Sequence, residues 1–295
     1  MKRPDTQLPV APDRRPLIPL PPGSTDCHAH VFGPQHCYPM LAETHFVPHE
    51  TPFAMYREML LSLGCQRAVL VQPSVYGTDN RMIEDAVLTE RTKTQAGIEL
   101  RAVGVVSPDV TDRELERLHA LGFRGIRINL AAGTPGLKLA DALPLARRIE
   151  HLGWHLQLYA DFELHPEVAD ALAALPVSFV IDHFGRVRGG QSMEASAPRA
   201  LLHLFELDHC WVKLSGVYFV SEMSPRHDDL AELVSALLAQ APHRLVWGTD
   251  WPHVSARQRM PTDSDLCDAL ASWIPDETAR RRVLVDNPAQ LYGFA

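Results

Sequence analysis

Eight short apolar runs, each followed by a longer segment with helical spacing, constrain the fold of this chain more than any other feature. Several helical segments end in a glycine just before the next run, as at Gly64, Gly122 and Gly153, which is typical of a helix-to-strand connection. Strands that alternate with helices form a parallel sheet, and eight such units in 295 residues favour a closed barrel. The expected strands span residues 25–28, 67–72, 101–106, 125–129, 155–159, 178–182, 211–214 and 244–248, and the expected helices span 52–63, 82–95, 112–121, 140–152, 166–174, 199–207 and 228–239.

The sequence therefore predicts an α/β fold, a single (β/α)8 TIM-like barrel over residues 23–295, with extra helices within residues 263–294. No Gly-x-Gly-x-x-Gly turn follows the first run, which argues against an open dinucleotide-binding sheet. Residues 1–22 are rich in proline, which disfavours both helix and sheet hydrogen bonding. We expect this N-terminal segment to be an extended arm that lies against the surface or is disordered.

Composition excludes several classes of function. The net charge of -8 and the absence of a basic stripe argue against a nucleic-acid-binding protein. No apolar stretch is long enough for a membrane span, and the first residues lack the apolar segment of a secretion signal, so we expect a cytoplasmic protein. Five cysteines without a Cys-x-x-Cys spacing indicate neither a disulfide framework nor a zinc knuckle. The oligomeric state is left open.

The first expected strand carries a pair of histidines, His28 and His30. Side chains alternate between the two faces of a strand, so Asp26, His28 and His30 should share one face while Cys27 and Ala29 take the other. Two imidazoles would then converge on one point. The pair alone is a weak signal in a chain with 15 histidines, and other polar groups must support it.

Such polar groups stand at the ends of the other strands, where (β/α)8 barrels carry their active sites. Each has a structural alternative: Asp250 could cap a helix, His183 could be a core histidine, and Arg127 could pair with a structural aspartate. No Gly-x-Ser-x-Gly elbow is present, so a serine nucleophile is not expected. The strand-end side chains are His28 and His30, Gln72 and Ser74, Arg127 and Asn129, Tyr159 and Asp161, Asp182 and His183, Ser215 and Tyr218, and Asp250.

Short sequence motifs at these strand ends resemble the amidohydrolase superfamily, in the branch that includes 2-pyrone-4,6-dicarboxylate lactonase and related sugar-acid lactonases. They occur in order from the first strand to the last, so the resemblance covers nearly all of the chain except the proline-rich arm. The motifs are Asp26-Cys27-His28-Ala29-His30-Val31-Phe32-Gly33-Pro34, Leu70-Val71-Gln72-Pro73-Ser74, Gly77-Thr78-Asp79-Asn80-Arg81, Gly122-Phe123-Arg124-Gly125-Ile126-Arg127-Ile128-Asn129, Ile181-Asp182-His183-Phe184-Gly185-Arg186, Lys213-Leu214-Ser215-Gly216 and Trp247-Gly248-Thr249-Asp250-Trp251-Pro252.

The resemblance implies a hydrolase whose catalytic centre contains His28, His30, His183 and Asp250. Two departures from the family pattern limit what can be carried over. Members with two metals use a bridging lysine after the fourth strand, where this chain has Arg127 and Asn129, so a dimetal site is disfavoured. Relatives of the dicarboxylate lactonase carry an arginine shortly after the Ser-Gly of the seventh strand, which this chain lacks. One arm of a dicarboxylate clamp is therefore in question.

Hydrolysis of a lactone needs a base that activates water and an electrophile that polarises the carbonyl. We assign the base to Asp250, and we expect His28, His30 and His183 to polarise the carbonyl through N–H donors. Alternatively, the three histidines and Asp250 would together hold one divalent ion, zinc or manganese. The resemblance favours the option in which no metal is required.

The expected partner is a small anionic substrate such as a carboxylated lactone. Arg127 would hold its carboxylate, with Ser74, Asn129 and Tyr159 as further contacts and Arg186 as a second, loop-borne cation. Alternative functions are a mononuclear metal-dependent decarboxylase of an aromatic or unsaturated acid, a lactone isomerase, and a barrel that binds an acidic metabolite without turnover.

Overall fold

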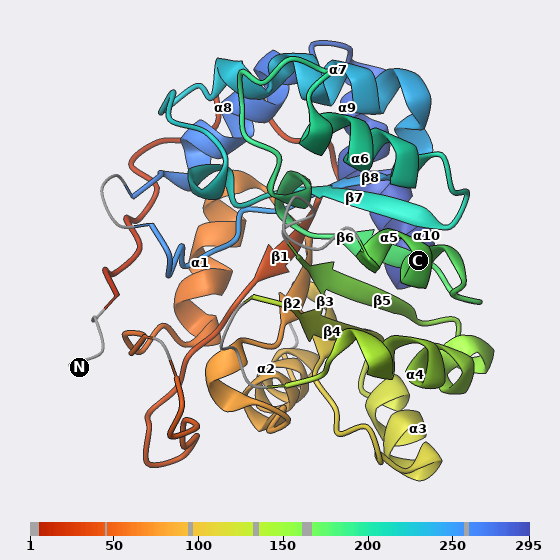
Figure 1. Ribbon diagram of the computed structural model, residues 1–295. Helices are drawn as coiled ribbons and strands as arrows, with labels where there is room; N and C mark the ends of the chain where they lie inside the picture. Colours follow the sequence, from red (N-terminus) through yellow and green to blue (C-terminus); the bar gives the residue numbers. More distant parts are fainter. Residues whose placement is uncertain (1–5, 45, 94–96, 132–135, 161–166, 257–259) are drawn as a thin grey trace.

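A computed structural model describes residues 6–44, 46–93, 97–131, 136–160, 167–256 and 260–295, and in it eight parallel strands form a nearly closed barrel (Figure 1). The first and last strands meet through backbone hydrogen bonds: His30 N donates to Trp251 O at 2.7 Å and Asp250 N donates to His28 O at 2.8 Å. The predicted (β/α)8 barrel is confirmed. The strands, in their order around the barrel, are β1 (Thr25–Ala29), β2 (Arg67–Val71), β3 (Glu99–Gly104), β4 (Phe123–Asn129), β5 (His155–Tyr159), β6 (Phe179–Ile181), β7 (Cys210–Leu214) and β8 (Leu245–Trp247).

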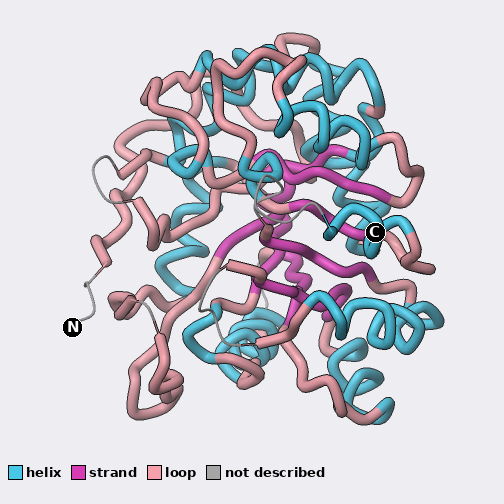
Figure 2. Tube along the Cα trace, viewed as in Figure 1, coloured by secondary structure: helices cyan, strands magenta, loops and turns pink. Residues whose placement is uncertain are grey.

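Helices surround the strands (Figure 2). Their apolar side chains are buried against the outer side of the barrel. The expected glycine stops adopt the left-handed conformation, with φ of 90° at Gly64, 98° at Gly122 and 64° at Gly153. The helices between the strands are α1 (Phe53–Leu63), α2 (Arg81–Arg91), α3 (Asp112–Ala120), α4 (Ala142–Ile149), α5 (Glu167–Ala173), α6 (Ser196–Phe205) and α7 (Ala231–Gln240); α8 (Asp263–Trp273), α9 (Glu277–Arg281) and α10 (Asn287–Tyr292) follow β8. No helix among the described residues is long and apolar enough to cross a bilayer.

The described part of the N-terminal arm, from residue 6 onward, has neither helix nor strand and packs against α8. Arg14 forms ion pairs with Asp265 at 2.5 Å and with Asp268 at 2.7 Å, and the backbone oxygen of Arg14 accepts a hydrogen bond from Ser264. This arm therefore extends over the surface of the barrel.

A β-bulge in β1 changes the direction of the side chains that strict alternation predicts. Between Asp26 and Ala29, β1 advances three residues while β2 advances two, so one residue of β1 is extra. Cys27 consequently packs inside the barrel with valines of β2, β3, β6 and β8, and His28 faces the interior as well. Asp26 lies on the other side and accepts a hydrogen bond from Thr249 at 2.6 Å. We expected Asp26 on the same face as the histidines and Cys27 on the opposite face. This prediction is wrong for both residues.

Gly248 follows β8 at a point where β1 approaches too closely for a side chain. A Cβ at Gly248 would lie 2.6 Å from the backbone N of His28 and 2.8 Å from the Cβ of His28. We expect Gly248→Ala to lower the free energy of unfolding by about 1–3 kcal/mol in urea denaturation and to lower kcat because His28 is displaced. Gly64→Ala is the matched control: no atom lies within 4 Å of its Cβ, so it should lose stability through its left-handed backbone alone and keep kcat. Unchanged stability in Gly248→Ala would contradict this packing.

Candidate active site

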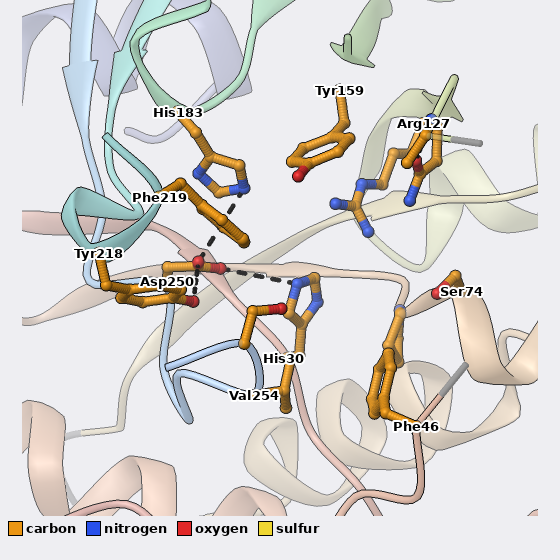
Figure 3. Close-up of a pocket in the computed structure, with 14 residues that line it drawn as sticks. His30, Phe46, Ser74, Arg127, Tyr159, His183, Tyr218, Phe219, Asp250 and Val254 are labelled. Carbon is orange, nitrogen blue, oxygen red and sulfur yellow. Dashed lines mark hydrogen bonds and ion pairs between the residues drawn. The ribbon is translucent and has the colours of Figure 1, made fainter. Parts of the chain in front are cut away.

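A cavity of about 150 Å³ opens at the carboxyl ends of the strands, where the sequence places the candidate site (Figure 3). Several of its walls come from connecting segments after the strands and were not predicted: Phe46, Val254 and Ser255 lie in loops and Phe219 in a short 3-10 helix, and none carries a sequence signal for a site. The lining also contains Tyr218, one of the strand-end side chains, and the predicted site residues His30, Ser74, Arg127, Asn129, Tyr159, His183 and Asp250.

Asp250 is surrounded by imidazoles from β1 and from the turn after β6. Its Oδ1 lies 3.5 Å from Nε2 of His28 and 3.7 Å from Nε2 of His30, and its Oδ2 lies 4.0 Å from Nε2 of His183. Tyr218 donates a hydrogen bond to Oδ2 at 2.5 Å (Figure 3). The three histidines and the aspartate predicted to converge therefore do so, and all three Nε2 atoms face the one carboxylate.

The carboxyl of Asp250 is ionised at neutral pH. Burial alone would raise its pKa, but the neighbouring His183, His28 and His30 and the hydrogen bond from Tyr218 outweigh burial and lower the pKa below its usual value. A carboxylate in this state can accept a proton from a bound water molecule.

The backbone at Asp250 and His183 is held in the left-handed region, with φ of 66° and 53°. Neither residue is a glycine, so each conformation costs free energy that the surrounding structure must supply. Such strain clusters at functional sites, and here it occurs at two of the four residues predicted to be catalytic.

The hydrogen-bond partner of each Nδ1 atom determines whether Nε2 of His30 or His183 is a donor or an acceptor. Nδ1 of His30 lies 2.7 Å from the carbonyl oxygen of Val71, which can only accept, so Nδ1 carries the proton and Nε2 keeps a lone pair. Burial lowers the pKa of His30 to about 4, so this ring is neutral at pH 7. Nδ1 of His183 lies 2.9 Å from the hydroxyl oxygen of Ser215, which can donate or accept.

His28 lies behind Asp250 and has no exposed surface, so it does not line the cavity. Its Nδ1 is 3.2 Å from Nζ of Lys213 and 3.4 Å from Oδ1 of Asp182. Gln157 joins this buried group by accepting a hydrogen bond from Lys213 at 2.7 Å and donating one to Asp182 at 3.0 Å. No role for Lys213 or Gln157 was predicted from the sequence, although a lysine and a glutamine within apolar strands are unusual.

Arg127 points into the barrel as predicted, because its neighbours Ile126 and Ile128 pack in the outer core. Its Nη1 donates to the backbone oxygen of Gln72 at 3.1 Å, and its Nε lies 3.8 Å from Oδ2 of Asp182. Both alternatives for this arginine are thus compatible with its position: it has a structural aspartate nearby, and its guanidinium faces the cavity.

Arg186 is a second predicted site residue, after His28, that does not line the cavity. Its guanidinium carbon lies 4.6 Å from the ring centre of Phe219 and 5.7 Å from that of Tyr159, so it stacks behind these aromatic walls. Another strand-end residue, Asp161, lies outside the described residues.

Among the residues that the structure describes, two groups of side chains could by residue type hold a metal ion, each with ligand atoms within 4.8 Å of one another. They are His28, His30 and Asp250, and His28, Asp182 and His183. A metal on Nε2 of His28 requires a lone pair there, and hence a proton on Nδ1. Nδ1 instead faces the Lys213 ammonium, which can only donate, so the ring as packed fits a metal on Nε2 poorly. A metal on Nδ1 fits poorly as well, because the ammonium lies 3.2 Å from Nδ1 and 3.3 Å from Oδ1 of Asp182, where it would repel a second cation.

Comparison with known proteins identifies the family to which the chain belongs. Residues 25–294 match the amidohydrolase family. The chain is 37% identical over 278 residues to 4-sulfomuconolactone hydrolase from Hydrogenophaga intermedia, covering 93% of this chain and 90% of that protein. It is 33% identical over 289 residues to 2-pyrone-4,6-dicarboxylate hydrolase from Comamonas testosteroni, covering 94% and 92%. A crystal structure of a probable 2-pyrone-4,6-dicarboxylic acid hydrolase from Acinetobacter baumannii, with citric acid bound, matches with a TM-score of 0.80 and 28% identity, covering 92% of this chain and 100% of that one. The chain therefore belongs to the amidohydrolase family.

Proposed function

We propose that this protein is a hydrolase that opens a small carboxylated lactone by attack of water on the ring ester. The observation that carries the proposal is the ionised Asp250 in a cavity that also presents His30, His183 and the guanidinium of Arg127. Lactone hydrolases among its relatives support the same reaction class.

Asp250 and His30 suit the binding of the attacking water. Oδ1 of Asp250 and Nε2 of His30 are 3.7 Å apart, and both are hydrogen-bond acceptors. A water molecule between them would donate one O–H to each and keep its oxygen lone pairs for the acyl carbon. Asp250 then takes one proton of the water as the new C–O bond forms.

His183 is proposed to stabilise the oxygen of the lactone carbonyl. If the Ser215 hydroxyl donates to Nδ1 of His183, its Nε2–H is a donor that faces the cavity. The acyl C–O bond of the ring then breaks, and the proton held by Asp250 passes to the leaving oxygen. The products are one hydroxyl group and one new carboxylic acid.

Arg127 is proposed to hold the carboxylate of the substrate on the opposite wall of the cavity, with Ser74, Asn129 and Tyr159 as further polar contacts. Arg186 is proposed as a more distant cation, because it reaches the cavity only across the rings of Tyr159 and Phe219. An anionic substrate is thereby favoured over a neutral ring ester.

We propose that the reaction requires no metal ion, because the packing of His28 disfavours a lone pair on Nε2. The test is turnover of carboxylated lactones before and after treatment with a chelator. Turnover that resists chelation supports the proposal, and turnover that is lost and then restored by zinc or manganese would revive the decarboxylase alternative. Carbon dioxide release would also indicate a decarboxylase, and an isomeric lactone with no new acid would indicate an isomerase.

Tyr218 provides a test of the assigned base through pH. Its hydrogen bond favours the charged form of Asp250, so Tyr218→Phe should raise the pKa of Asp250. We expect the acidic limb of the kcat/KM profile to move to higher pH, because the base then loses its proton at higher pH. Tyr38→Phe is the control, because Tyr38 bonds the surface residue Asp85 and should leave the profile unchanged. An unshifted limb in Tyr218→Phe would argue against Asp250 as the base.

A further inference from the structure

Lys213 is a lysine with no exposed surface, located in β7 beneath the cavity. Its Nζ has three acceptors close by: Oε1 of Gln157 at 2.7 Å, Nδ1 of His28 at 3.2 Å and Oδ1 of Asp182 at 3.3 Å. Asp182 is the counterion that a buried ammonium requires. The contacts with Gln157 and His28 are within hydrogen-bond reach, and the contact with Asp182 is an ion pair without hydrogen-bond geometry.

This arrangement determines the tautomer of the His28 ring. A proton on Nδ1 would point a second N–H group at the N–H groups of Lys213 at 3.2 Å, and one donor of the ammonium would lose its acceptor. The alternative partner of Nδ1, Oδ1 of Asp182, lies 3.4 Å away and receives no hydrogen bond from the ring. The orientation of Gln157 is consistent with a charged lysine and an ionised aspartate, because its oxygen accepts from Lys213 and its amide nitrogen donates to Asp182.

We propose that Lys213 is a positioning residue that keeps the proton of His28 on Nε2, aimed at Oδ1 of Asp250. Nε2 of His28 is buried without a hydrogen-bond partner among the described residues, and Oδ1 of Asp250, 3.5 Å away, is the acceptor we assign to it. The carboxylate then has a donor at each oxygen, His28 at Oδ1 and Tyr218 at Oδ2. These two donors fix its orientation toward the water site.

The same residue excludes a metal ion from the site. Without the ammonium, Nδ1–H of His28 would donate to Asp182, 3.4 Å away, and Nε2 would gain a lone pair. That lone pair, Nε2 of His30 and the carboxylate of Asp250 are three ligands of the kind that zinc prefers. The catalytic part of this inference rests on the proposed function, whereas the ring state and metal affinity do not.

The ring state can be measured in the wild-type protein without any substrate. Long-range proton–nitrogen correlation spectra of protein labelled with ¹⁵N-histidine distinguish a protonated ring nitrogen from an unprotonated one, and the His28→Gln variant assigns the signals. We expect His28 to be protonated on Nε2 and unprotonated on Nδ1 at neutral pH. A proton on Nδ1 of His28 in the wild type would overturn the proposal.

Lys213→Met tests whether the lysine causes this state. We expect the His28 proton to move to Nδ1 and the affinity for Zn²⁺, measured by equilibrium dialysis of the chelator-treated protein, to rise about 10–100-fold. Gln157→Leu is the matched variant, because it disturbs the same buried group but keeps Lys213 and its counterion Asp182, so His28 should stay protonated on Nε2 without gain of Zn²⁺. If Lys213→Met keeps the wild-type ring state and Zn²⁺ affinity, the proposal is wrong. If Lys213→Met does not fold, the position of the His28 proton in the wild-type spectrum is the test of the proposal.

Discussion

Asp250→Asn is expected to lower kcat by about 10²–10⁴-fold while substrate binding is retained. The amide has the shape of the carboxylate and can still accept the hydrogen bond from Tyr218, but it cannot take a proton from water. Steady-state assays on a carboxylated lactone give kcat, and calorimetric titration of the inactive variant with the same lactone gives the dissociation constant.

The control for Asp250→Asn is Asp265→Asn, which removes a carboxylate that pairs with Arg14 on the surface and should leave kcat unchanged. A loss of binding equal to the loss of kcat would mean that Asp250 holds the substrate instead of activating water. Full turnover by Asp250→Asn would exclude the assigned base.

Arg127→Met is expected to raise KM for carboxylated lactones by about 10–100-fold, because hydrogen bonds to a charged group contribute about 1.5–3 kcal/mol. The effect on kcat should be smaller, since the carboxylate of the substrate is bound equally in the ground state and in the transition state. The measurement is the KM and kcat of wild type and variant on matched lactones with and without a carboxylate.

The lactone without a carboxylate is the internal control for Arg127, because its KM should not change in the variant. Arg127→Lys keeps the charge but loses the planar fork, so it should recover part of the affinity. An equal loss on both substrates would indicate that Arg127 serves mainly to neutralise Asp182, which lies 3.8 Å away.

The fold could be predicted because its determinants are local in sequence. Apolar runs, helical spacing and the glycine stops at Gly64, Gly122 and Gly153 each report on their own element, and eight repeats of one unit leave few alternatives to a barrel. The meeting of His30, His183 and Asp250 followed from the fold, since the strands of a parallel barrel end at one face.

The details of the site could not be predicted because they depend on contacts distant in sequence. The bulge in β1 arises from the register of β1 against β2, which the sequence of β1 alone does not reveal. The prediction from strict alternation therefore put Asp26 and Cys27 on the wrong faces. The role of Lys213 becomes visible only when β1, β5, β6 and β7 surround its ammonium. Arg186 was expected in the cavity, but its stacking on Phe219 depends on loop conformation.

The most direct test of the central claim is hydrolysis of a carboxylated lactone by chelator-treated protein in H₂¹⁸O, followed by mass spectrometry of the product. The account predicts one new carboxylic acid per lactone consumed, with a single ¹⁸O atom in that carboxylate. An unlabelled isomeric lactone, release of carbon dioxide, or turnover only after addition of a divalent metal would contradict it.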